Sequence, residues 1–88
     1  MKASHILVDA ESEAKRILGD INSKKMSFED AARTFSKCPS RKQGGDLGNF
    51  GKGAMVKPFE EATEKLKVGQ ISSPVKTEFG WHLIKRTG

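Results

Sequence analysis

The chain contains one cysteine and two histidines, and these side chains have the most chemistry to offer. Cys38 lies in the stretch "FSKCPS", directly before Pro39 and just upstream of the glycine-rich run "GGDLGNFGKG". His5 lies near the start of the chain in "SHILV", and His82 near its end in "GWHLIK". A thiol with an imidazole is the minimum set for a cysteine hydrolase. A thiol with two imidazoles could also ligate zinc.

Neither of these chemistries has a matching sequence pattern. The three side chains are far apart, without the paired spacing of a zinc site, and no local signature of a cysteine protease is present. The glycine run lacks the pattern of a phosphate-binding loop and does not separate a strand from a helix. A buried, chemically inert cysteine and hydrogen-bonded core histidines therefore stay open as alternatives. We expect no metal and no cofactor.

Two short segments at opposite ends of the chain are expected to carry the histidines as strands. Residues 4–8 are rich in β-branched side chains, and residues 80–87 alternate His82 and Ile84 with Trp81 and Leu83. N- and C-terminal strands often pair in the middle of a small antiparallel sheet. Such pairing would bring the two imidazoles together, with Cys38 at the lip of an apolar pocket and the Thr77 hydroxyl nearby.

Three helices are expected between these strands. The first has an apolar stripe at helical spacing and Asp9 as a candidate N-cap. The second begins at Ser27, with Asp30 completing a capping box. The third has Pro58 in its first turn and Gly69 as the C′ residue just beyond its end. The stripe of the first helix consists of Ala14, Ile17, Leu18 and Ile21.

Length and composition limit the classes of protein that the chain can represent. Its 88 residues allow one domain, over residues 1–88, and the element order predicts an α+β fold with a small antiparallel sheet. No apolar run is long enough to cross a membrane, and the start of the chain lacks the features of a signal peptide. A single cysteine fits a reducing compartment, which favours a cytoplasmic monomer. A domain taken from a larger exported protein would look the same.

The net charge of +5 raises the question of nucleic acid binding. The sixteen Lys and Arg residues are scattered along the chain and interleaved with eleven Asp and Glu residues. No dedicated basic block appears, so this pattern favours a solvated basic surface over a nucleic-acid interface.

Three segments together resemble the parvulin-type peptidyl-prolyl cis/trans isomerases. They are "ASHILV", "FSKCPSRKQGGDLGNFGKGAMVKPFEEA" and "SSPVKTEFGWHLIKRTG", and they occur in this order over essentially the whole chain. The resemblance is greatest to the minimal single-domain members. It implies a parvulin/FKBP-like fold, a four-stranded antiparallel sheet surrounded by four helices in the order β-α3-β-α-β2. The helix missing from the pattern analysis would be a short turn within "PSRKQGG".

The resemblance also implies the site residues. The catalytic set would be His5, Cys38, Thr77 and His82. The substrate-binding set would be Leu47, Phe50, Met55, Phe59 and Phe79. In the second set, Leu47, Met55 and Phe59 match the proline-binding pocket and Phe50 supports it, while Phe79 stands where some relatives carry a small polar residue.

The implied function is rotation of X–Pro bonds in peptides and in unfolded or partly folded proteins, a rotamase and chaperone activity without covalent chemistry. Relatives that require a phosphorylated residue before proline carry a long basic loop after the first strand, whereas this chain has Asp9, Glu11 and Glu13 there. We therefore expect no dependence on phosphate. Two rival functions stay open: a peptide-holding domain with negligible turnover, and a nucleic-acid binder.

Overall fold

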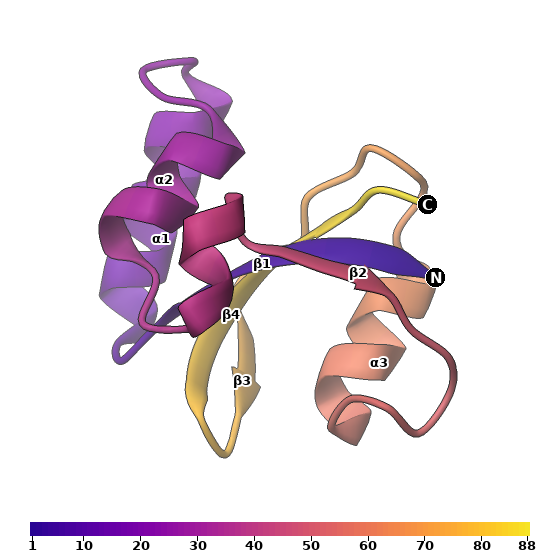
Figure 1. Cartoon of the computed structure of the whole chain (residues 1–88). Helices are drawn as coiled ribbons and strands as arrows, with labels where there is room; N and C mark the ends of the chain where they lie inside the picture. Colours follow the sequence, from indigo (N-terminus) through magenta and orange to yellow (C-terminus); the bar gives the residue numbers. More distant parts are fainter.

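Two strands from opposite ends of the chain form the centre of the sheet (Figure 1). The computed structural model describes all 88 residues. Strand β1 (Lys2–Val8) pairs antiparallel with β4 (Gly80–Arg86), in a register that runs from Ala3 opposite Arg86 to Val8 opposite Trp81. Strand β2 (Asp46–Asn49) flanks β1, and β3 (Val75–Thr77) flanks β4, which gives the order β2-β1-β4-β3. The expected four-stranded antiparallel sheet is confirmed.

Three α-helices and one short 3₁₀ helix surround this sheet. They are α1 (Glu11–Asn22), α2 (Phe28–Phe35), α3 (Lys57–Lys65) and the 3₁₀ helix η1 (Pro39–Gln43). The fourth helix that the resemblance implied is therefore η1, and it lies within the segment expected to hold it. No helix has the length and apolar composition that crossing a bilayer requires.

Each face of the sheet is covered by its own hydrophobic cluster, because α1 and α2 lie on one side and α3 on the other (Figure 1). The two faces alternate along the central strands, as the period of a strand requires. Leu83 therefore packs toward α1 and α2, while its neighbours His82 and Ile84 face α3. The larger cluster consists of Ile6, Val8, Ala14, Ile17, Phe28, Ala31, Ala32 and Leu83. The smaller one consists of Ala3, Phe50, Phe59, Leu66 and Ile84.

The helix boundaries correct two of the sequence predictions. Ser27 caps α2 as expected, since its Oγ accepts a hydrogen bond from the Asp30 N–H at 3.1 Å. Asp9 does not cap α1: the N-cap is Ala10, without a side-chain hydrogen bond, because the Asp9 carboxylate is paired with Lys37. Gly69 is not the C′ residue of α3 either, since that helix ends at Lys65 and its C-cap, Leu66, is already extended.

Two glycines allow loops to approach the backbone of β1 closely. A Cβ on Gly45 would lie 2.4 Å from the carbonyl oxygen of His5, and one on Gly80 would lie 2.6 Å from that of Val8. Both glycines also have positive φ angles, +86° and +138°, which L side chains rarely adopt. These glycines bring the segment before β2 and the β3–β4 turn against β1 on either side of the site described below.

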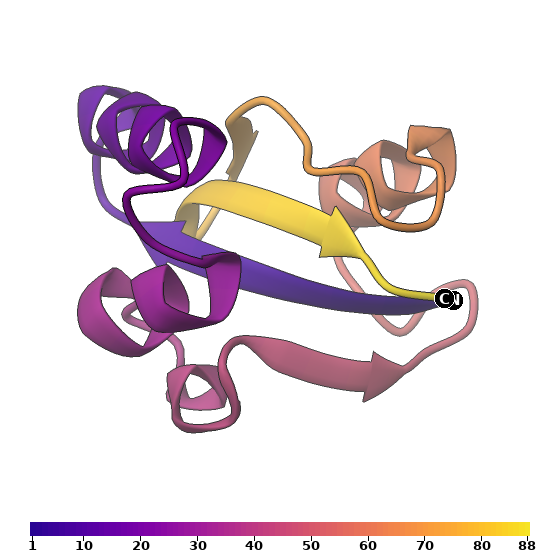
Figure 2. The same ribbon diagram turned by 90° about the horizontal axis from the view of Figure 1, so that it is seen from above.

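The two ends of the chain lie side by side, as both views show (Figures 1 and 2). The Lys2 N–H donates to the Gly88 carbonyl, and the Gly88 N–H donates to the Lys2 carbonyl, each at 3.1 Å. The antiparallel pairing of β1 with the C-terminal segment thus continues to the last residue.

Candidate active site

The two histidines meet at the centre of the sheet, on the face that α3 covers. His5 on β1 and His82 on β4 are diagonal neighbours, because His5 is opposite Ile84 and His82 is opposite Leu7. Their rings stack at a centroid distance of 5.2 Å and an angle of 19°, and their Nδ1 atoms are 3.0 Å apart. The strand pairing expected from sequence therefore produces a direct hydrogen bond between the imidazoles.

A threonine on the neighbouring strand extends this hydrogen bond into a chain. The Thr77 Oγ1 lies 2.7 Å from Nε2 of His82 and also accepts a hydrogen bond from the Phe79 N–H at 3.1 Å. All three polar side chains, His5, His82 and Thr77, are buried. The last nitrogen of the chain, Nε2 of His5, is buried without a partner.

Two proton arrangements are compatible with this chain, and they differ in what they leave unsatisfied. In the first, Thr77 donates to Nε2 of His82, whose Nδ1–H donates to His5; only the Nε2–H of His5 then lacks a partner. In the second, all donors are reversed, and both the Thr77 hydroxyl hydrogen and the Nε2 lone pair of His5 lack one. Because unsatisfied buried polar groups are costly, the first arrangement is favoured. It presents an N–H of His5 as a free donor.

Burial keeps both imidazoles uncharged at neutral pH. It lowers the pKa of His5 to about 4, with a further lowering from the neighbouring His82. Burial alone lowers the pKa of His82 to about 4. The charged form of a buried imidazole loses hydration that the protein does not replace here. The polar chain therefore carries no net charge.

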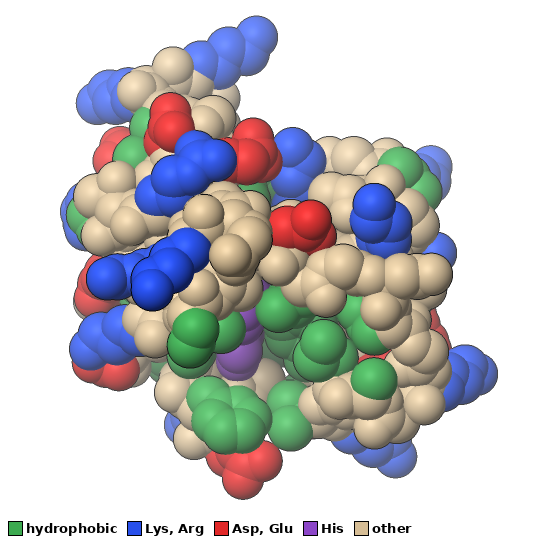
Figure 3. Space-filling view, in the orientation of Figure 1, with side chains coloured by type: hydrophobic (Ala, Val, Ile, Leu, Met, Phe, Trp, Pro, Cys, Tyr) green, Lys and Arg blue, Asp and Glu red, His purple; other side chains and the backbone are tan.

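A cavity of about 480 Å³ opens beside the histidine pair. Its walls include Leu47, Met55 and Phe59, and the Phe59 ring stands nearly perpendicular to both imidazoles, at 81° in each case. Phe79 lies at the rim with 61% of its surface exposed. The space-filling view shows this hollow, with a histidine visible in its depth between hydrophobic side chains (Figure 3).

Cys38 reaches the same cavity because a buried serine ties its segment to β1. The Ser36 Oγ accepts hydrogen bonds from the N–H groups of Leu7, at 3.1 Å, and of Cys38, at 3.3 Å. The Lys37 N–H in turn donates to the Leu7 carbonyl at 2.8 Å. This strap, residues 36–38, occupies the edge of β1 beyond the end of β2. It fixes the backbone on which the thiol is carried.

The structure gathers most of the residues that the sequence analysis assigned to the site. His5, Cys38 and His82 line the cavity together with four of the five expected substrate-binding residues, namely Leu47, Met55, Phe59 and Phe79. Phe50 does not line it: this side chain lies behind Phe59, at a ring centroid distance of 6.2 Å. Thr77 does not line it either, and contacts the site through His82.

Sequence reasoning missed five lining residues and the serine of the strap. The five lining residues are Leu7, Lys37, Pro39, Ala54 and Val56. The alternation of β1 could have identified Leu7, since it faces the same side as His5. Ser36 offered no such signal, because a serine after a helix is common at surface turns, whereas this one is only 1% exposed.

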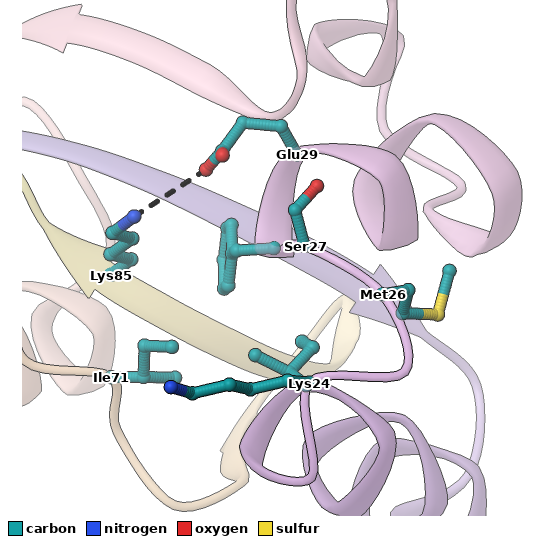
Figure 4. A pocket seen from close by; sticks show the side chains of 8 residues that line it. Lys24, Met26, Ser27, Glu29, Ile71 and Lys85 are labelled. Atoms are coloured by element: carbon teal, nitrogen blue, oxygen red, sulfur yellow. Dashed lines mark ion pairs between the residues drawn. The ribbon is translucent and has the colours of Figure 1, made fainter.

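A second cavity, of about 380 Å³, lies against the other hydrophobic cluster (Figure 4). It is lined by apolar side chains such as Ile21 and Ile71, and its Lys85 and Glu29 form an ion pair at 3.5 Å. No histidine or cysteine reaches it. The chemistry-bearing residues are thus concentrated at the first cavity. No group of three or more His, Cys, Asp or Glu side chains is arranged to hold a metal ion.

Comparisons with known proteins match this fold and most of this chain. A protein-family model described as rotamase, PPIC-type PPIASE domain, matches residues 4–88. The chain is 54% identical over 79 residues to "Peptidyl-prolyl cis-trans isomerase Pin1" of Malus domestica, covering 90% of this chain and 65% of that protein. It is 51% identical over 88 residues to "Foldase protein PrsA" of Geobacillus kaustophilus, covering 99% of this chain and 31% of that protein. The chain thus spans less than two thirds of either relative.

Two solved structures show the same arrangement. A crystal structure of the peptidylprolyl isomerase PrsA from Bacillus anthracis superposes with a TM-score of 0.97 at 50% identity, over 100% of this chain and 41% of that one. The solution structure of NmPin, the parvuline of Nitrosopumilus maritimus, gives a TM-score of 0.88 at 49% identity, over 100% of this chain and 95% of that one. The second match shows that this fold also occurs with little additional chain.

Proposed function

The chain belongs to the PPIC-type peptidyl-prolyl isomerase (rotamase) family, the parvulins, and we propose that its pocket accelerates cis/trans rotation of X–Pro bonds without covalent chemistry or a requirement for phosphate. One observation carries the proposal. Leu47, Met55 and Phe59 form an apolar cavity directly against a neutral pair of imidazoles.

The reaction needs no bond to carbon to be formed or broken. Rotation about the X–Pro bond has a barrier of about 18–20 kcal/mol, because the twisted amide loses its resonance. A catalyst therefore has only to bind the twisted amide more tightly than either planar isomer. Lowering the barrier by about 4 kcal/mol would accelerate rotation roughly a thousandfold.

The apolar walls favour the twisted amide in two ways. Phe59 offers a flat surface to the pyrrolidine ring and Met55 an adaptable one, so the ring can be held while the preceding carbonyl swings. The planar amide is the more dipolar state, because resonance places negative charge on its oxygen. A pocket of low polarity therefore destabilises the planar amide relative to the twisted one.

The polar chain contributes by staying neutral and fixed. A protonated imidazole beside the cavity would attract the carbonyl oxygen and so stabilise the planar state, which opposes rotation. The low pKa values of His5 and His82 prevent this at neutral pH. Cys38 adds a polarisable sulfur at the cavity wall, where the strap of residues 36–38 positions it.

Independence from phosphate is supported by the connection that follows β1. Only Asp9 and Ala10 lie between β1 and α1, and the first turn of α1 carries Glu11 and Glu13. This connection therefore offers no basic loop to a phosphate on the residue before proline, and its carboxylates would repel one.

Folding clients are the proposed substrates. One relative is named a foldase, and a solved structure at 42% identity is described as one of two SurA-like chaperones of Campylobacter jejuni. The cavity is open at its exposed Phe79 rim, so an extended or unfolded segment could present a proline to it.

A protease-coupled assay with X–Pro peptides tests this function. The wild-type protein should accelerate isomerisation, and Phe59→Ala should reduce kcat/KM by about a hundredfold or more, since it removes a pocket wall worth about 3 kcal/mol. Leu66→Ala is the matched control, because Leu66 belongs to the same hydrophobic cluster but not to the cavity. No acceleration by a folded wild-type protein would leave the peptide-holding function instead.

Substitutions of Cys38 test the non-covalent mechanism. We expect both Cys38→Ser and Cys38→Asp to retain activity within about tenfold, because neither abolishes a polar group at the cavity wall. Complete loss in both, with a covalent adduct in the mass spectrum of the wild-type protein, would instead identify Cys38 as a nucleophile.

A further inference from the structure

Lys37 is the one cation that lines the proline-binding cavity. Its backbone is fixed, since its N–H donates to the Leu7 carbonyl at 2.8 Å within the strap of residues 36–38. Its side chain is 55% exposed at the cavity rim. A substrate held in the cavity therefore has a positively charged group of this protein within its reach.

The Lys37 ammonium group is already paired with a carboxylate of the same chain. The Lys37 Nζ forms an ion pair and hydrogen bond with Asp9, which directly follows β1. The Asp9 hydrogen bond raises the pKa of Lys37, and the charges of Asp9 and of Glu13 on α1 act in the same direction. Both partners of the pair are largely exposed. Exposed pairs of this kind contribute little stability and exchange readily with other charges.

Asp9 has no structural role that would otherwise explain it. It immediately precedes Ala10, the N-cap of α1, but its side chain does not cap the helix, since the N-cap has no side-chain hydrogen bond. The only side-chain partner of its carboxylate is Lys37. The pair therefore affects the rim of the cavity more than the fold.

We propose that Lys37 is a specificity-determining residue for the side chain that precedes proline, and that Asp9 is an internal competitor that masks it. The inference rests on the proposed function, since it assumes that the prolyl ring lies between Leu47, Met55 and Phe59. It also places the preceding residue beside Lys37 and Cys38, which line the same cavity. An acidic side chain there must displace Asp9 before it can pair with Lys37. The wild-type protein therefore discriminates only weakly between acidic and neutral residues before proline.

The test compares two peptides that differ only in charge, with Glu or Gln before proline. The ratio of their kcat/KM values should be near one for the wild-type protein at low salt. In Asp9→Asn the ratio should rise about two- to fivefold in favour of Glu, the range expected for an exposed ion pair. The gain should disappear in the double variant Asp9→Asn with Lys37→Gln, and shrink at about 1 M salt.

The matched control is Glu61→Gln on α3, which raises the net charge by the same amount. Glu61 pairs only with Lys57, at 4.0 Å, and does not line the cavity. Its ratio should equal that of the wild-type protein. A ratio in Asp9→Asn equal to that in Glu61→Gln, or a gain that survives Lys37→Gln, would overturn the proposal.

Peptide binding followed by NMR separates this proposal from the proposed function. If no peptide is isomerised, the proposed function fails, and the Kd values of the Glu and Gln peptides then decide on Lys37 alone. The same ratio is expected for these Kd values, with the same dependence on Asp9 and Lys37. A Kd ratio that does not respond to Asp9→Asn would overturn the proposal whether or not the protein is an isomerase.

Discussion

At the scale of single residues, the histidine pair makes the free energy of unfolding depend on pH. In the unfolded chain each imidazole titrates near 6.5, whereas in the folded protein the pKa of each is lowered to about 4. Between these values the unfolded state binds more protons than the folded state. The free energy of unfolding therefore rises with pH across this window and falls as the solution is acidified. One imidazole titrating over this range accounts for roughly 3 kcal/mol.

Urea unfolding at several values between pH 7 and pH 4.5 measures this dependence. The control is a variant in which His5 and His82 are both replaced by Gln. The two proteins are compared by the slope of the free energy of unfolding against pH, not by their absolute stabilities. We expect a clearly smaller slope in the variant. Equal slopes would mean that the two imidazoles are not held neutral by burial.

The Thr77 hydroxyl sets the tautomer of His82. Thr77→Val preserves shape but removes the donor to Nε2, so we expect the proton of His82 to move to that nitrogen and kcat/KM to fall about tenfold. Thr77→Ser should restore both. The ¹⁵N chemical shifts of the His82 ring report the tautomer directly. Wild-type shifts in the Val variant would contradict the proton arrangement derived above.

At the scale of elements, Gly45 allows the segment between η1 and β2 to lie against β1. In Gly45→Ala the new Cβ would clash with the His5 carbonyl, and the φ of +86° adds backbone strain. We expect a loss of at least about 3 kcal/mol in the free energy of unfolding and a weakened contact between His5 and His82.

Two other glycines separate the components of that effect. Gly48 has a φ of +71° with nothing within 4 Å of an added Cβ, and Gly51 has open space without a positive φ. Gly48→Ala should cost about 1 kcal/mol from conformation alone, and Gly51→Ala within about 0.5 kcal/mol. Chemical denaturation of the three variants gives the comparison. A Gly45→Ala protein as stable as Gly48→Ala would show that the close approach carries no cost.

What could be predicted from sequence differs between local and distant contacts. The Ser27 cap and the position of Pro58 follow from interactions within one helical turn, and both predictions are confirmed. The pairing of β1 with β4 followed from strand alternation and the usual place of terminal strands. The prediction of Asp9 as a helix cap was wrong, because its partner Lys37 is 28 residues away and no local sequence pattern indicates such a pair.

The site shows the same limit. The family resemblance named the cavity walls, but it could not show that Phe50 stands behind Phe59 or that Ser36 fastens Cys38 to β1. Both facts depend on how the strands and the strap pack in three dimensions. Burial of a polar side chain at a helix end is decided by tertiary contacts, which short-range spacing does not encode.

At the scale of the whole molecule, adjacent chain ends predict that the order of the elements can be changed. A circular permutant that joins Gly88 to Met1 through a short glycine linker and opens between Lys24 and Lys25 should fold. The opened turn is exposed, and Lys24 has a strained φ of +63° that the cut releases. Retained isomerase activity and the His5–His82 coupling by NMR would check it. An unfolded permutant would show that β1 must begin the chain for the sheet to form.

The same geometry makes the domain suitable for transplantation. Segments leading into Lys2 and out of Gly88 would run about one strand spacing apart, roughly 4.8 Å, because the two residues are hydrogen-bonded neighbours. The entire unit could be inserted into a single surface loop of a host protein without forcing the ends of that loop apart. The insertion would constrain the host fold no more than a tight hairpin does. The proposed isomerase activity could in this way be added to an unrelated scaffold.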